Sequence, residues 1–241
     1  MRTPERRASS LDPAPGSLHR KAVEAGMPSS LMSRHRPIIV IGGILVSVSV
    51  VIVGMTLQRP EPPTYAPSPV EPRPVGEERV GPLVRTVDAT VPDQWVHFSF
   101  RDGSVIADPG PRNWDLAFRR FGIIANGGDG FAGHGGIVDL GETPFDSVRV
   151  LPEQGYVQTE VRGDSVNAAI ERWYSYSIFS HLLQPLPKVY GVRTADGRYA
   201  KMRIRGYYCA GATPGCVTIE YVFQGDGSRD VGGPSRIAES R

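Results

Sequence analysis

Histidine is the residue type in this chain best suited to acid–base or ligand chemistry. Three histidines follow residue 90, at His97, His134 and His181. Imidazoles act as general bases and ligate metals or haem iron, so the three could form one site. No motif around them marks a general base, and no helical or hairpin spacing forces them together. Each one alone is more often an ordinary surface or hydrogen-bonded side chain.

The two cysteines, Cys209 and Cys216, flank a segment with turn chemistry between two expected strands. Opposed hairpin positions bring Cα atoms about 4.5–5.5 Å apart, which is disulfide distance. Zinc sites and c-type haem attachment use other cysteine spacings. We therefore expect a disulfide and no metal site. Because the chain also lacks a G-x-S-x-G motif, we expect no catalytic centre and no enzymatic activity.

A glycine-rich segment spans residues 126–136 and contains His134. It lacks the Lys-Ser/Thr of a P-loop and leads into no helix, so a phosphate cradle is disfavoured. The composition predicts a mobile loop. Such a loop, carrying His134, could close over a flat ligand.

A row of basic side chains alternates with apolar ones along the predicted strand 199–208. The row consists of Lys201, Arg203 and Arg205. Because successive side chains of a strand point to opposite faces, the pattern places this row outward and the apolar residues inward. Glu220 of the next strand falls on the same face, which favours a solvated, charge-paired surface. The alternatives are a surface for an acidic partner or for haem propionates.

The elements that would position these residues are strands. Alternating apolar and polar residues recur over residues 83–229, with Asp102-Gly103 and Asp196-Gly197 as hairpin turns. We count seven or eight strands and no amphipathic helix after residue 60. The fold class predicted is therefore an antiparallel all-β domain.

A membrane anchor is expected before this domain. Residues 38–57 contain no ionisable side chain, and 20 helical residues cover the roughly 30 Å hydrocarbon core of a bilayer. The long leader and the missing A-x-A-like site argue against a cleaved signal peptide. Arg34 and Arg36 precede the span, whereas Glu61 offsets Arg59 after it. The positive-inside rule then predicts a cytoplasmic N-terminus and a periplasmic domain at a bacterial inner membrane.

The remaining segments are expected to be tails and a linker. Residues 1–37 form a basic cytoplasmic tail, and residues 230–241 a flexible C-terminus. Residues 58–82 form a Pro-rich linker, with seven prolines between residues 60 and 74. Polyproline II geometry would make this part a semi-rigid stalk up to about 45 Å long. The formal net charge of +2 gives no field for polyanions, so no nucleic-acid partner is expected.

Three stretches of the chain resemble the HmuY family of bacterial envelope haem-binding proteins. They are Trp114–Gly128, Thr143–Val148 and Val192–Arg203. The resemblance extends over most of residues 86–225. It implies an all-β, non-enzymatic envelope domain, which in well-known members takes up haem through axial histidines.

The chain departs from this family pattern at the expected ligand position. A ligand histidine follows the W-D-x-A-x stretch in haem-scavenging members, and here that position is Arg119. An arginine stays protonated and has no lone pair for iron. Haem would then need other ligands, for which His134 and His181 are the candidates, with Met202 as a further possibility.

The anchor is the second departure, because haem-scavenging relatives are typically lipoproteins or released proteins. A single span suits a subunit of an assembly better than a roaming scavenger. We therefore expect a non-catalytic, single-pass accessory subunit without a resident cofactor. Its domain would dock on or brace an integral membrane complex, respiratory or photosynthetic, and residues 38–57 would contact the lipid bilayer. The alternative is a membrane-tethered periplasmic haem-binding protein.

Overall fold

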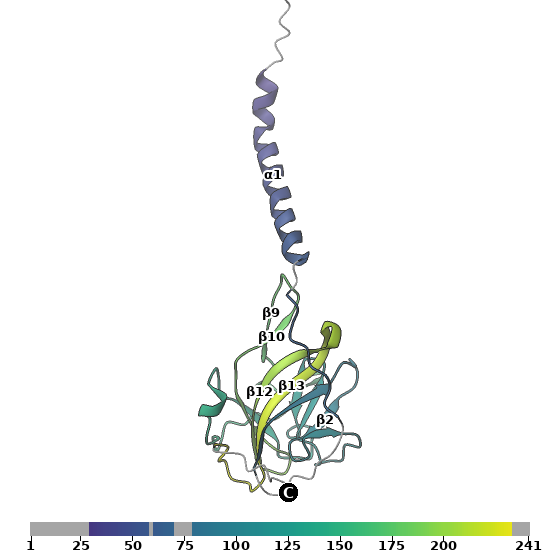
Figure 1. Cartoon of the computed structure of the whole chain (residues 1–241), viewed down its shortest axis with the longest axis vertical. Helices are drawn as coiled ribbons and strands as arrows, with labels where there is room; N and C mark the ends of the chain where they lie inside the picture. Colours follow the sequence, from purple (N-terminus) through teal and green to yellow (C-terminus); the bar gives the residue numbers. More distant parts are fainter. Residues whose placement is uncertain (1–28, 58–59, 70–78, 233–241) are drawn as a thin grey trace, which may run out of the picture. The chain divides into compact units, whose positions relative to one another are not determined.

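The structure, a computed structural model, describes residues 29–57, 60–69 and 79–232 (Figure 1). Most of the predicted basic tail, part of the linker and residues 233–241 lie outside the described residues. Two compact units are distinguished, residues 1–51 and 52–241. One helix and thirteen strands make up the regular structure of the described chain, together with two short 3-10 helices.

Helix α1 runs from Ser29 to Leu57, so it begins nine residues before the predicted span. Its segment Arg36–Met55 is long and apolar enough to cross a membrane. The hydroxyl groups of Ser47 and Ser49 donate hydrogen bonds to carbonyls one turn earlier, at 2.9 and 2.8 Å. These polar side chains are therefore satisfied within the helix and need no water.

The larger sheet has five antiparallel strands in the order β1-β13-β12-β11-β6. Their bounds are β1 Val80–Asp88, β6 Gly136–Asp139, β11 Tyr190–Arg193, β12 Tyr199–Cys209 and β13 Thr213–Gln224. The turn at Asp196-Gly197 joins β11 to β12, as the sequence predicts. Long hairpin arms β12 and β13 form the centre of the domain (Figure 1).

A second sheet has the order β3-β2-β4-β5, and two small hairpins complete the domain. The second sheet contains β2 Val96–Ser99, β3 Ser104–Ile106, β4 Leu116–Arg119 and β5 Gly122–Ala125. The hairpins are β7 Glu160–Val161 with β8 Ser165–Val166, and β9 Tyr174–Tyr176 with β10 Leu183–Pro185. The 3-10 helices are η1 Phe145–Ser147 and η2 Ala210–Ala212. The all-β prediction is confirmed, and these two- to four-residue strands account for the larger strand count.

The core lies between the two sheets and follows the predicted alternation. Alternate residues of β12 and β13 are buried in it, namely Ala200, Met202, Ile204, Val217, Ile219, Tyr221 and Phe223. Edge-on ring contacts join the sheets: the Phe98 and Phe100 rings lie 5.9 and 5.0 Å from that of Tyr221. Such aromatic pairs add to the free energy gained by burying apolar area.

The predicted semi-rigid stalk does not stand apart from the domain at residues 60–69, because these residues pack against it. The Tyr65 amide donates to the carbonyl of Tyr208 at 2.8 Å, and the Ser68 amide donates to the carbonyl of Thr86 at 2.9 Å. A Cβ on Gly206 would lie 2.2 Å from the Tyr65 ring, so the ring occupies the space beside this glycine. Polyproline II leaves backbone donors unpaired, and here the amides of Tyr65 and Ser68 are used on the domain.

The domain is also larger than predicted at its C-terminal side. Val231 is buried, and its amide donates to the carbonyl of Arg149 at 2.7 Å. The packed chain therefore includes residues 60–69 and 79–232 rather than 83–229 alone.

Candidate functional site

The predicted basic row is not uniformly exposed, since Lys201 is only 3% exposed. Its ammonium donates to the carbonyls of Phe145 and Val148 at 3.0 and 2.8 Å. It also lies 4.6 Å from the centroid of the Phe145 ring. Burial lowers the pKa of Lys201. Lys201 lies on the predicted face, opposite Ala200 and Met202, but the solvent exposure predicted for it is wrong, because a distant segment covers the strand here. Lys201 links η1 to β12.

The other two members of the row form a charge cluster with Glu220, as the sequence predicts. Arg203 Nε and Arg205 Nη1 lie 2.8 and 2.5 Å from the same carboxylate oxygen of Glu220. Burial on its own raises the pKa of Glu220, but hydrogen bonds from Arg205 and Arg203 outweigh it and hold that pKa below its usual value. Part of each arginine's hydrogen-bonding capacity is thereby used within the sheet.

The candidate ligands His134 and His181 lie near opposite ends of β12. The His134 amide donates to the carbonyl of Ala195, in the turn just before β12. His181 lies at the tip of the β9–β10 hairpin, where the Leu183 amide donates to the Tyr208 hydroxyl near the other end of β12. Ten steps of about 3.3 Å separate the two ends of this strand, roughly 33 Å in all. The structure therefore does not bring the two imidazoles together on one iron.

The remaining candidates are engaged elsewhere. The His181 Nδ1 atom is hydrogen-bonded to the Tyr176 hydroxyl at 2.6 Å. The His97 ring packs edge-on against Trp114 at 4.6 Å, and burial lowers its pKa. Met202 is fully buried in the core, so its sulfur is not open to a ligand.

The glycine-rich segment 126–136 is packed, so the prediction of a mobile loop is wrong. Buried Asn126 organises it: its carbonyl accepts from the Gly135 amide at 2.8 Å, and its side-chain amide donates to the carbonyl of Trp114 at 2.9 Å. A Cβ on Gly127 would lie 2.1 Å from the Gly135 carbonyl oxygen. These glycines allow two backbone segments to approach closely, which composition alone does not distinguish from flexibility. His134 itself is exposed.

A cleft of about 660 Å³ lies around Arg119, the position where the family resemblance places a haem ligand. The Arg119 guanidinium pairs with the carboxylate of Asp164 and lies 4.4 Å over the Trp95 ring. Phe121 and Tyr174 line the same cleft, with ring centroids 5.8 Å apart. The cleft combines aromatic faces with a paired cation.

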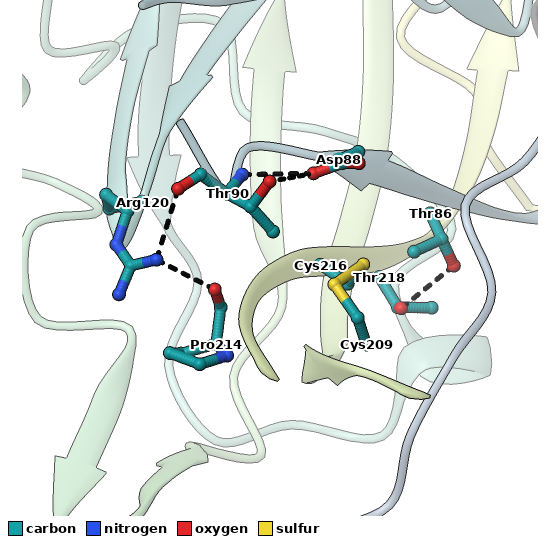
Figure 2. The surroundings of a disulfide bond; sticks show 8 residues. All are labelled: Thr86, Asp88, Thr90, Arg120, Cys209, Pro214, Cys216 and Thr218. Carbon is teal, nitrogen blue, oxygen red and sulfur yellow. Dashed lines mark hydrogen bonds between the residues drawn. A yellow bond between two sulfur atoms is a disulfide. The ribbon is translucent and has the colours of Figure 1, made fainter. Parts of the chain in front are cut away.

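The β4–β5 turn that carries this arginine is tied to the tip of the β12–β13 hairpin (Figure 2). Arg120 has a left-handed φ of 53°. Its Nη1 donates to the carbonyls of Thr90 and Pro214 at 3.2 and 2.9 Å. The hairpin tip is closed by the Cys209–Cys216 disulfide, with Cα atoms 5.0 Å apart, so the expected bond is present. Both Arg119 and Arg120 line the cleft, and Arg120 also ties the turn to the hairpin tip.

Haem does not fit this cleft through the ligands typical of haem uptake. The lining residues among the described chain include no histidine, cysteine or methionine. Arg119 supplies donors and a positive charge but no lone pair. Tyr174 supplies a phenol, and its ring packs edge-on against Trp173 and Phe121. A pair of axial histidines is therefore not available here.

Comparison with known proteins places this fold in a family. The family model described as HmuY protein matches residues 92–221, more than half of the chain. The chain belongs to the HmuY family. No curated protein matches its sequence.

Solved structures similar to the HmuY domain come from bacteria. The apo HmuY analogue of Tannerella forsythia is 20% identical, with a TM-score of 0.49, covering 61% of this chain and 97% of that one. A protein of Bacteroides vulgatus, described as a proposed HmuY-like haem-binding protein, is 24% identical, with a TM-score of 0.46, covering 61% and 96%.

Within the HmuY domain, Asp115 of the W-D pair is a structural residue. Its carboxylate is buried and accepts from the amides of Phe100 and Ala195 at 2.8 and 3.0 Å. Burial raises the pKa of Asp115 to about 7. The side chain thereby links the turn after β2 to the turn before β12.

The described residues contain one cluster of three side chains of metal-ligating types, Asp88 with Cys209 and Cys216. Both sulfurs are bonded to each other. Metal ligation by cysteine requires the thiolate, so this cluster does not have the chemistry of a metal site.

Proposed function

We propose that this chain is a non-catalytic, single-pass membrane subunit whose HmuY domain docks on or braces a larger membrane complex. The packing of residues 60–69 against the domain carries this proposal. Only residues 58 and 59 separate the end of α1 at Leu57 from this packed segment. Three Cα–Cα steps span at most about 11 Å. Because the link to the membrane helix is so short, we expect the domain to contact proteins of the same membrane rather than ligands far from the membrane surface.

The arginine at the family's ligand position supports a role other than haem uptake. Arg119 is held by Asp164 and Trp95, and the candidate histidines lie near opposite ends of β12. The contacts of His97, His181 and Met202 are structural. These observations support the proposal that the domain functions through a protein-binding surface rather than through a haem site.

We further propose that the domain is periplasmic and α1 crosses a bacterial inner membrane with its N-terminus in the cytoplasm. Arg34 and Arg36 lie at the start of the apolar segment, while Arg59 is followed by Glu61. This distribution supports the orientation by the positive-inside rule. Respiratory and photosynthetic assemblies are the host class we propose.

Purification from native membranes in mild detergent, followed by native electrophoresis, tests the docking role. We expect the chain to co-migrate with other integral membrane proteins. A matched control is Gly206→Val, whose side chain would displace Tyr65 and release the packed segment; we expect weaker co-migration. A lone monomer band for the wild-type chain would contradict the proposal.

A membrane-tethered haem-binding protein is the second candidate. The cleft around Arg119 favours it, because the rings of Trp95, Phe121 and Tyr174 lie beside arginines that could pair with carboxylates. Haem titration into the full-length protein in detergent tests it. A Soret shift in the wild-type protein would support this candidate and would count against the first. Loss of that shift in His134→Ala or His181→Ala would place the haem at that histidine, outside the cleft.

A further inference from the structure

The tip of the β9–β10 hairpin exposes apolar side chains. Tyr176, Ile178 and Phe179 are 52%, 68% and 52% exposed. No Asp, Glu, Lys or Arg occurs anywhere from residue 173 to residue 187. The chain therefore presents a solvent-facing tip without formal charge, apart from the titratable imidazole of His181.

Three backbone amides of this tip donate hydrogen bonds within it. The Ser177 amide donates to the carbonyl of Leu182 at 3.0 Å, and the His181 amide donates to the carbonyl of Ser177 at 2.8 Å. The Ser180 amide donates to the Ser177 hydroxyl at 3.3 Å. The Tyr176 hydroxyl is bonded to His181. An apolar surrounding would thus leave these groups satisfied, and that is the condition for placing polar backbone near hydrocarbon.

The hairpin lies beside the segment that connects the domain to α1. Residues 60–63 line a cleft of about 230 Å³ together with Leu182, Leu183 and Tyr208. In Figure 1, β9 and β10 lie next to the blue strip of chain that enters the domain. Because Pro60 follows Leu57 by three residues, the hairpin is tied to the part of the chain nearest the end of the apolar helix.

We propose that Tyr176, Ile178 and Phe179 at the hairpin tip insert into the interfacial region of the bilayer that α1 crosses. This inference rests on the proposed membrane anchor. Aromatic and aliphatic side chains without neighbouring charge are typical of interfacial segments. Protein partners fit less well, because a stable protein interface covers about 800 Å² on each side, far more than three side chains offer.

Insertion gives the domain a second attachment beside α1. A single tether leaves a domain free to rotate about the tether, whereas two contacts fix which face is turned toward the membrane. The hairpin is itself fixed to β12 through the Leu183 amide and the Tyr208 hydroxyl, 2.7 Å apart. Insertion of the tip would therefore also fix the orientation of the central sheet relative to the membrane.

Site-specific fluorescence in the full-length protein tests the proposal. Because both native cysteines are bonded to each other, Ile178→Cys supplies a single free thiol for an environment-sensitive dye under non-reducing conditions. After reconstitution into lipid nanodiscs, we expect a blue-shifted emission that lipid-borne quenchers reduce. Val150→Cys is the matched control, since Val150 is 63% exposed and pairs with Asp230 beyond the end of β13; we expect water-like, unquenched emission. Val48→Cys reports on α1.

Each outcome discriminates between the insertion and the anchor. Quenching at 48 and 178 but not at 150 supports the insertion. Quenching at 48 alone overturns the insertion and leaves the anchor intact. Without quenching at 48, both the anchor and the insertion are overturned. Water-like emission at 178 in pure lipid that becomes blue-shifted only with native membrane proteins present would mean that a protein covers the tip, and would also overturn the insertion.

Discussion

The basic row on β12 and the tip of the β9–β10 hairpin differ in how many of their side chains already have partners within the domain. Lys201 is buried and bonded to two carbonyls, and Arg203 and Arg205 share the Glu220 carboxylate. At the hairpin tip, Ile178 and Phe179 have no charge to pair and remain more than half exposed.

This difference indicates that the charged residues of the basic row stabilise the fold, whereas the uncharged side chains of the hairpin tip remain available for binding. A paired charge offers little to a new ligand, because binding must first break or share the existing contact. Exposed apolar area is not compensated in this way, so covering it is favourable at about 25 cal/mol per Å².

The largest expected effect is on stability at Lys201. Lys201→Ala removes a buried side chain and leaves two carbonyls without their donor, so we expect a loss of about 2–4 kcal/mol in the free energy of unfolding. Urea unfolding in detergent, followed by tryptophan fluorescence, measures it. Lys188→Ala, which removes the 2.7 Å contact with Asp139, should cost under about 1 kcal/mol. Equal small losses would show that Lys201 acts as a surface charge.

Glu220→Gln should cost about 1–3 kcal/mol at neutral pH, because it removes the carboxylate that the two arginines share. Because Arg203 and Arg205 are partly exposed, solvent screens both ion pairs, and we expect a value toward the lower end of this range. Since the folded-state pKa of Glu220 lies below its ordinary 4.5, the wild-type advantage should persist at neutral pH. It should vanish as the pH falls below 4.5 through the folded-state pKa. A pH-independent difference between the two proteins would contradict this assignment.

Arg119→His should change ligand binding more than stability. The pair with Asp164 is partly exposed, so its loss should cost under about 1 kcal/mol. The new imidazole supplies a lone pair in the cleft, and we expect a Soret shift on adding haem. Arg119→Gln is the matched control, with the charge removed but no imidazole gained, and should show no shift. Identical spectra for both variants would show that this position does not face the ligand.

The smallest effect is expected at the hairpin tip. Ile178→Ser combined with Phe179→Ser should change the free energy of unfolding by no more than about 0.5 kcal/mol, since both side chains are exposed. Leu183→Ser, which alters a side chain packed against the core, should cost about 1–2 kcal/mol. A large loss in the tip variant would mean that the fold already uses this surface.

Local patterns were enough to predict the long central strands. Alternation along β12 and β13 and the Asp-Gly turns depend on neighbouring residues, and the structure follows them. The pairing of Glu220 with Arg203 and the Cys209–Cys216 bond were also predictable, because both connect adjacent arms of one hairpin.

Contacts between distant segments could not be predicted in this way. Lys201 is buried by residues more than fifty positions earlier in the chain, and Tyr65 packs on Gly206. The alternation that predicts strands over residues 83–229 does not single out the hairpin tip. Its signal was the absence of charged residues from 173 to 187 around an Ile-Phe pair, which strand alternation does not use.

Neutron reflectometry of the full-length chain in a supported bilayer tests most directly whether the domain is held at the membrane. A free stalk over residues 60–74 would leave a water layer of up to about 45 Å between the lipid headgroups and the domain. With residues 60–69 packed on the domain, we predict that protein density begins at the headgroups. A water layer of tens of ångströms would contradict the account.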